Sequence, residues 1–335
     1  MSANAEPAHE ATPLPRPERS RGPLRYAADR RMVGMVVAYF TLLAVEWNFA
    51  PLTPLVVIPL VVVTAGLAFL GAVATHNTLH CPVFKSRWMN NVWQVALTLT
   101  YGHPVCSYVP GHNLSHHHHT ETRRDVMRTT KARFRWNLLN LAFFFLSVSG
   151  SIMRAEAGYT RYAFKRRPRW SKQLMVETAI YVAWIVGLLL LDWKRFLLFV
   201  QIPHWYAAWG IVTMNIFQHD GCDADSQYNH SRNFVGGVIN WFTFNNGYHT
   251  VHHDRPGLHW SVAPEVHARL VSPHIHPALE QASFTTYLWR AYFWPGVRLR
   301  YDGTPVVLPE EGPDEPWYGE AAVVAPREGL EPEAA

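Results

Sequence analysis

The sequence predicts an all-α integral membrane protein: four transmembrane helices in two hairpins, further helices at the membrane interface, and a cytoplasmic cap domain that carries histidine motifs. Three observations favour this fold class. Hydrophobic residues make up 49% of the 335 residues, and charged residues only 16%. Four stretches are apolar over about 20 residues, the length that crosses a bilayer. The 14 Trp, 14 Tyr and 17 Phe suit helices that end among lipid headgroups.

The predicted spans pair into two hairpins because the connection within each pair is short. These connections lie around Pro51 and at residues 192–195. The four spans are Val33 to Ala50, Leu52 to Thr75, Leu174 to Leu191, and Phe196 to Phe217. The first 24 residues are polar and rich in proline, so we expect no signal peptide.

Two further stretches are expected to lie at the interface. Trp88 to Tyr101 is too short to span the bilayer. Trp136 to Met153 is long enough, but its crossing would put the basic run 154–172 on the opposite side from the basic N-terminal arm. That arrangement opposes the positive-inside rule, and it would separate the last histidine motif from the first two. With four spans, both termini and every histidine motif lie on the cytoplasmic side.

The net charge of +5 is concentrated beside hydrophobic runs, in the N-terminal arm and between Arg123 and Lys172. Basic residues in these places indicate membrane orientation, so we expect a bilayer and no nucleic acid as partner. The composition predicts three regions: a disordered arm over 1–24, a membrane domain over 25–300, and a disordered acidic tail with prolines over 301–335. We interpret the tail as a solvated end.

Histidine is the only abundant metal ligand, because the three Cys lie far apart and form no C-x-x-C pair. Four motifs space two residues four apart, which would place each pair on one face of a helix. These pairs are His76/His80, His112/His116, Asn215/His219 and His249/His253. With His117 and His252, the motifs hold nine His and one Asn, too many for one four-coordinate ion. Two metal ions are therefore the economical count.

The motifs resemble those of the membrane fatty acid desaturase family, over roughly Val33 to Trp260. That family has H-x(3 or 4)-H, then H-x(2 or 3)-H-H, then H-x-x-H-H. His76 and His80 match the first box; His112, His116 and His117 the second; His249, His252 and His253 the third; and Asn215 with His219 resembles an additional ligand pair. Thr120 fits the H-H-x-x-T of the second box and favours His116 and His117 as ligands. The run of four His leaves a shift toward His118 and His119 open.

The resemblance implies a non-haem diiron centre that uses O2 as cosubstrate and oxidises an unactivated C–H bond of a fatty acyl or lipid chain. Its implied ligands are His76, His80, His112, His116, His117, Asn215, His219, His249, His252 and His253. Desaturation is the favoured outcome; hydroxylation, acetylenic bond formation and terminal-alkene-forming decarboxylation stay open. We expect electrons from a separate ferredoxin or rubredoxin with its reductase, or from cytochrome b5. The heavy use of Arg over Lys favours a bacterial inner membrane.

Other interpretations of the same residues stay beside this one. A His-rich metal-binding or metal-transport membrane protein is the alternative class, although it would carry ionisable residues in mid-span, where only His204 lies. We read as structural the lone His103, His204, His230, His259, His267, His274 and His276, with His230 and His259 near enough to the boxes to contact ligands. The basic residues after the second box suit topology, a headgroup or carrier phosphate, or an acidic electron-transfer protein; they are Arg123, Arg124, Arg128, Lys131, Arg133 and Arg135.

Overall fold

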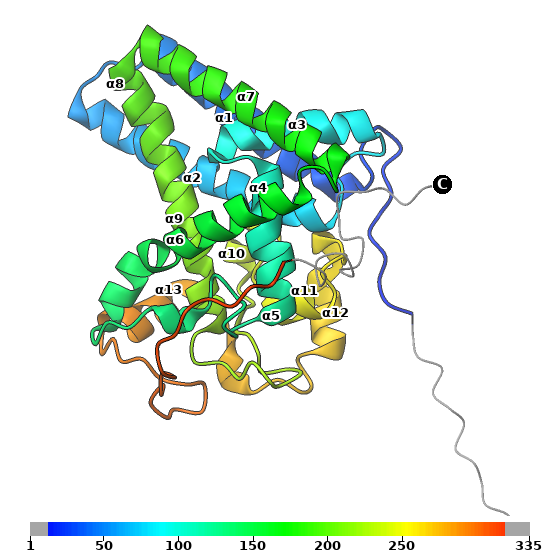
Figure 1. The fold of residues 1–335 in the computed structure, drawn as a ribbon, viewed down its shortest axis with the longest axis vertical. Helices are drawn as coiled ribbons and strands as arrows, with labels where there is room; N and C mark the ends of the chain where they lie inside the picture. The colour runs from blue at the N-terminus through cyan, green and yellow to red at the C-terminus, as the bar shows by residue number, and fades with distance from the viewer. Residues whose placement is uncertain (1–12, 319–335) are drawn as a thin grey trace, which may run out of the picture.

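The computed structural model describes residues 13–318, and most of these residues are helical (Figure 1). The long helices are α1 (Arg30–Phe49), α2 (Pro54–His80), α6 (Asn137–Ala163), α7 (Pro168–Leu191) and α9 (Ile202–His219). The shorter α-helices are α3 (Arg87–Tyr101), α4 (Val105–Val109), α5 (His117–His119), α8 (Trp193–Phe196), α10 (Gly237–Phe242), α11 (His249–Asp254), α12 (Ala263–Leu270) and α13 (Phe284–Leu288).

Short segments of other types complete the described chain. Three turns are π-helical: Pro110–His116, Leu197–Gln201 and Trp289–Phe293. Four are 3-10 helices: Ala27–Asp29, Thr129–Lys131, Trp260–Val262 and Pro277–Leu279. The strands β1 (Asn233–Phe234) and β2 (Glu280–Gln281) pair in parallel, with Asn233 opposite Glu280. The sheet therefore joins the segment before α10 to the segment before α13.

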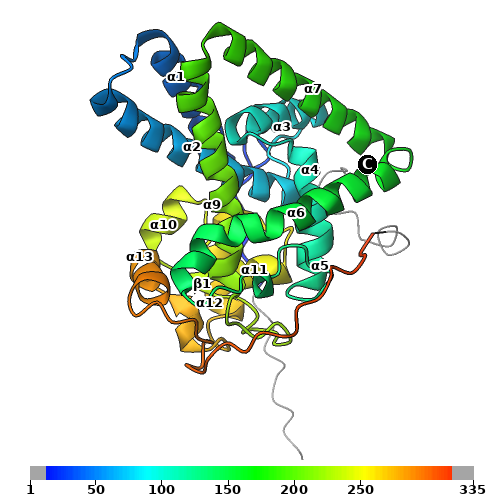
Figure 2. The same ribbon diagram turned by 60° about the vertical axis from the view of Figure 1, so that its left-hand side comes forward.

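Each predicted pair of helices is joined by a short turn, but only α1 and α2 pack against each other, whereas α7 and α9 diverge from their turn (Figure 1 and Figure 2). α1 turns into α2 around Pro51, and α7 turns through α8 into α9. Both turns lie at the same end of the molecule, and α10 to α13 lie at the other end (Figure 1 and Figure 2). Arg195 ties the turns together by donating from Nη1 to the carbonyl of Glu46 at 2.6 Å. The long apolar helices thus hold the histidine-bearing segments at one end.

Helix α2 lies at the centre because small residues let its neighbours approach closely. A Cβ on Gly71 would lie 2.6 Å from the side chain of Thr100 on α3. A Cβ on Gly210 of α9 would lie 2.8 Å from the ring of Phe69 on α2. Close approach through small residues is how helices pack in a membrane. This packing fixes the ends of α2 and α9, where both helices carry histidines.

Five described helical segments are long and apolar enough to cross a membrane, against four predicted. They are Ala27–Phe49, Pro54–His80, Asn137–Ala163, Pro168–Leu191 and Trp193–His219. Only 6% of the apolar window of α7 is buried, as expected of a helix surrounded by lipid. The fifth candidate is α6, which extends the predicted stretch to Ala163 and lies across α9 in both views (Figure 1 and Figure 2).

Parts of both ends make defined contacts where the sequence predicted disorder. Leu24 bridges to Phe84, and the amine of Lys85 donates to the carbonyls of Ser20 and Gly22 at 2.8 Å. At the other end, Trp317 is only 5% exposed. Side chains from distant parts of the sequence, such as Lys85, contact these ends, and composition does not reveal such contacts. The remaining residues of both predicted tails, 1–12 and 319–335, lie outside the described chain.

Candidate metal centre

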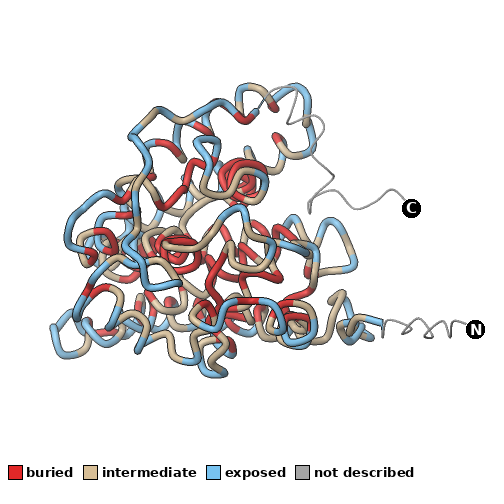
Figure 3. Tube along the Cα trace, turned by 90° about the horizontal axis from the view of Figure 1, so that it is seen from below, coloured by how far each residue is buried: buried red, intermediate tan, exposed pale blue. Residues whose placement is uncertain are grey.

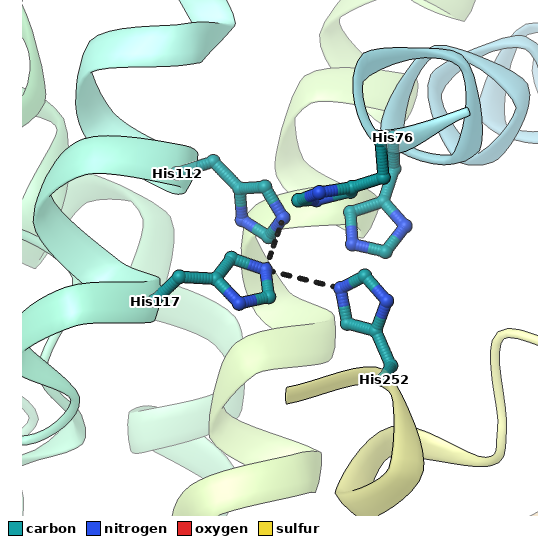
Figure 4. A group of neighbouring side chains, drawn as sticks. His76, His112, His117 and His252 are labelled. Atoms are coloured by element: carbon teal, nitrogen blue, oxygen red, sulfur yellow. Dashed lines mark hydrogen bonds between the residues drawn. The ribbon is translucent and has the colours of Figure 1, made fainter. Parts of the chain in front are cut away.

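The first histidine group joins three segments of the chain. His76 and His80 come from the end of α2, His112 and His117 from the second motif, and His252 from α11. Their ligand nitrogens all lie within 4.8 Å of one another. Nε2 of His117 lies 3.1 Å from Nε2 of His112 and 3.0 Å from Nε2 of His252 (Figure 4). The predicted pair His76/His80 does share one face and one group.

The second histidine group lies directly beside the first. It contains His116, His219 of α9, and His249 and His253 of α11, with ligand nitrogens again within 4.8 Å of one another. Nε2 of His249 lies 2.8 Å from Nε2 of His219 and 3.1 Å from Nε2 of His253. The rings of His117 and His253 stack 4.4 Å apart across the two groups. Six of the nine histidines are buried and three are half-buried. The buried segments of the chain gather in its interior (Figure 3).

A π-helical turn divides the second motif between the groups. The backbone N–H of His117 donates to the carbonyl of His112, five residues earlier, instead of four as in an α-helix. His112 therefore shares its group with His117, while His116 joins the other group. The prediction that His112 and His116 act as an i, i+4 pair on one face is wrong, because the local helix is not α.

Helix α11 serves both groups and is held by the strand before it. His249 and His253 share a face as predicted, and His252 turns to the first group. Asn233 of β1 accepts from the backbone N–H of Thr250 at 2.9 Å and donates to its hydroxyl at 2.8 Å. Asn233 is fully buried, so this pair of hydrogen bonds fixes the start of α11.

Burial lowers the pKa of five of the clustered histidines. Burial first, and neighbouring imidazoles second, hold the pKa of five rings well below the ordinary value: His112, His117, His249, His252 and His253. Neutral imidazole is the form that binds metal ions. Nε2 of His80 and Nε2 of His116 have no hydrogen-bond partner among the described residues. Converging ring nitrogens with no carboxylate among them fit two first-row transition-metal ions.

Two outer hydrogen bonds set the tautomers of His116 and His219 in the second group. Nδ1 of His116 lies 2.9 Å from the fully buried carboxylate of Asp125, which also accepts from the backbone N–H of Met127 at 2.8 Å. Nδ1 of His219 lies 3.1 Å from the carbonyl of His230. Each of these oxygens accepts a hydrogen bond from Nδ1–H. The proton therefore stays on Nδ1, and the Nε2 lone pair is free to bind a metal ion. Sequence reasoning missed Asp125; the available signal was an acidic residue in a basic stretch nine residues after His116.

The other predicted residues divide into those near the site and those away from it. Asn215 lies one turn before His219, and its Nδ2 donates to the carbonyl of Met127 at 2.6 Å, so it holds the loop that carries Asp125. His118 and His119 belong to neither group, and His118 is exposed, which supports the predicted register. His259 pairs instead with Asp29 at 2.9 Å, at the start of α1.

Comparison with protein families decides the wider identity. The family model for fatty acid desaturases matches residues 50–279, more than half of the chain. The chain belongs to the fatty acid desaturase family. The match covers every histidine of both groups, so the desaturase-family domain and the metal centre coincide. No curated protein matches the chain in a sequence search.

Proposed function

We propose that the protein is a membrane diiron oxidase that uses O2 to desaturate a fatty acyl or lipid chain. The observation that carries this proposal is the pair of adjoining all-histidine groups within a desaturase-family domain. Nine converging imidazoles suit iron, and their division into groups of five and four suits two ions. Asn215 completes the proposed ligand set, directly or through water.

The chain's own residues prepare the site for this chemistry. When bound, the iron pair would reduce O2 and supply the oxidising power that removes hydrogen from an unactivated C–H bond. Forming one double bond takes two hydrogens from the chain and two electrons and two protons from outside, so that O2 leaves as two waters. Asp125 and the carbonyl of His230 hold the protons of His116 and His219 on Nδ1, away from the irons. Six of the nine rings are buried, which excludes bulk water from them.

An apolar cavity supports a hydrocarbon substrate. It has a volume of about 750 Å³ and lies between α2, α10 and the start of α13, lined among others by Val63, Leu70, Val238 and Phe284. Val63 and Val238 are 53% and 77% exposed, so the cavity borders the surface that faces lipid. Leu70 lies six residues before His76, about 9 Å along the axis of α2. The proposal takes this cavity as the entrance for a chain dissolved in the bilayer, with Leu70 as the lining residue nearest to His76 along α2.

The proposal includes the predicted topology and donor. Four spans keep both basic stretches and the cap on the cytoplasmic side, with α6 at the interface. The crosswise direction of α6 relative to α9 supports this placement (Figure 2). The electron donor is a ferredoxin or rubredoxin with its reductase, or cytochrome b5. Labelling of single cysteines introduced at the two ends of α6 tests the topology: labelling from opposite sides would contradict it.

The function is tested by mass spectrometry of total lipids and hydrocarbons from cells that express the protein with a ferredoxin and its reductase. The comparison variant is His253→Ala, and the matched control is His118→Ala, whose exposed ring belongs to neither group. We expect a product two hydrogens lighter with the wild type and the control, and none with His253→Ala. Added oxygen or a shortened terminal alkene would move the assignment to hydroxylation or decarboxylation. Purified protein that holds zinc in both groups and gives no product would favour a metal-binding role.

A further inference from the structure

The acidic C-terminal segment 309–317 lies on the basic residues that follow the second histidine motif. The carboxylate of Asp314 pairs with Arg128, with the amine of Lys131 at 2.7 Å and with Arg154 at 3.8 Å. The side chain of Asp314 is only 23% exposed. The prediction of a solvated tail is therefore wrong for this segment, because three cations converge on one carboxylate.

Backbone contacts and a buried aromatic ring fix the same segment. Arg128 donates from Nη2 to the carbonyl of Gly312 at 3.0 Å, and the backbone N–H of Glu315 donates to the carbonyl of Arg123 at 2.9 Å. Trp317 stacks on Tyr159 of α6, with ring centroids 5.9 Å apart. The segment is thus held through a carboxylate, its backbone and an aromatic side chain.

Much of the positive charge remains accessible around this peptide. Arg124 and Arg154 have side chains that are 50% and 75% exposed. A polar cavity of about 600 Å³ lies between the segment and the basic loop, so the segment does not fill the surface that it covers. We call the residues Arg123, Arg124, Arg128, Lys131, Arg133 and Arg154 the basic surface. Such a cluster attracts acidic proteins over a distance set by ionic strength.

The basic surface is joined directly to the second histidine group. The hydroxyl of Ser115, one residue before His116, donates to the carbonyl of Arg124 at 2.7 Å and accepts from the backbone N–H of Val126 at 3.0 Å. Asp125, between these two residues, holds His116. A protein docked on the basic surface would stand one short loop away from a predicted iron ligand.

We propose that the basic surface is the docking site of an acidic electron-donor protein, and that segment 309–317 is a built-in competitor which the donor displaces. The inference rests on the proposed function, because an oxidase of this kind needs electrons from outside. A peptide-like occupant favours an acidic protein over a carrier phosphate, since the surface recognises backbone carbonyl and N–H groups as well as a carboxylate.

The test measures binding of a fluorescently labelled, acidic two-iron, two-sulfur ferredoxin to the full-length protein in nanodiscs of uncharged lipid. We expect Asp314→Asn and Trp317→Ala each to tighten binding about threefold to tenfold at low salt, because each weakens the competitor. The double variant Arg124→Glu with Arg154→Glu should weaken binding more than about tenfold. The matched control is Asp302→Asn, an exposed carboxylate outside the basic surface, which should leave binding unchanged.

Hydrogen exchange gives an independent measurement on the same samples. Addition of ferredoxin should raise the exchange rate of residues 309–317; unchanged exchange at saturation would overturn displacement. Equal ferredoxin affinity in wild type, Asp314→Asn and Trp317→Ala, or equal tightening by Asp302→Asn, would overturn competition. If coenzyme A, added as a second ligand, gains affinity in Asp314→Asn while ferredoxin does not, the surface is a phosphate site and the proposal fails. Binding needs no turnover, so a failed lipid assay contradicts the proposed function without touching this result.

Discussion

The two histidine groups differ in how their rings are held before a metal binds. In the second group, Nδ1 of His116 and Nδ1 of His219 each have an outer acceptor. In the first group, Nδ1 of His76 and Nδ1 of His117 have no partner among the described residues. Hydrogen bonds therefore preset the tautomers of His116 and His219 in the second group, although Nδ1 of His249 has no such acceptor among the described residues. The two rings of the first group rely on packing and on the metal itself. The two ions should differ in affinity and in electronic environment.

Removing one ligand from each group gives the largest effect and tests whether the groups are separate sites. His252→Ala and His253→Ala alter neighbouring residues of α11 but different groups. We expect each to lower product formation at least about a hundredfold and to remove about one iron per chain, because each ion loses one ligand. Iron and protein are quantified together on purified samples. Loss of both irons in both variants would show that the groups bind as one unit.

Asp125→Asn changes the hydrogen-bond acceptor of His116 and so affects the second group alone. The amide keeps the size of the carboxylate but loses its charge, so it holds His116 less firmly in the tautomer that offers Nε2. We expect activity or iron affinity to fall about 10- to 100-fold, with Mössbauer spectra changed for one iron only. The control is Asp225→Asn, an exposed residue in the loop that follows α9. Equal spectral changes at both irons would remove the proposed difference between the groups.

The sequence was sufficient to predict the long helices and the nine clustered histidines, because hydropathy and motif spacing are local. The division of the second motif was not predictable in the same way. It depends on a π-helical hydrogen bond between His112 and His117, and spacing alone favours the α-helical pair. The partner of Asp314 was also hidden, since only the folded chain brings Lys131 to it. Asp125 was missed for a related reason: a loop must turn back before its carboxylate meets His116.

Asn233→Ala should weaken metal binding by both groups, because α11 carries ligands of both. It thereby distinguishes a residue that supports both groups from one that supports a single group. The substitution removes the two hydrogen bonds that hold Thr250 at the start of α11. We expect the free energy of unfolding to fall by about 1–3 kcal/mol, with partial iron loss from both sites. Thermal unfolding and iron content measure these effects. Asn229→Ala, which loses a bond to His276 away from α11, is the control; iron loss confined to one site would contradict the shared role.

Glu121→Gln has the smallest expected effect on iron binding and probes the loop behind the second group. Burial raises the pKa of Glu121 to about 7, and its backbone N–H donates to Asp125 at 3.0 Å. The folded state therefore keeps a proton that the unfolded state releases near the ordinary value of 4.5, so stability falls as pH rises from about 4.5 to about 7 and levels off above. In iron-free protein the fall is at most about 3 kcal/mol, and Glu121→Gln should abolish it. Unfolding midpoints between pH 5 and pH 8 measure the slope, with the exposed Glu265→Gln as control; an unchanged slope in Glu121→Gln would show that another group titrates.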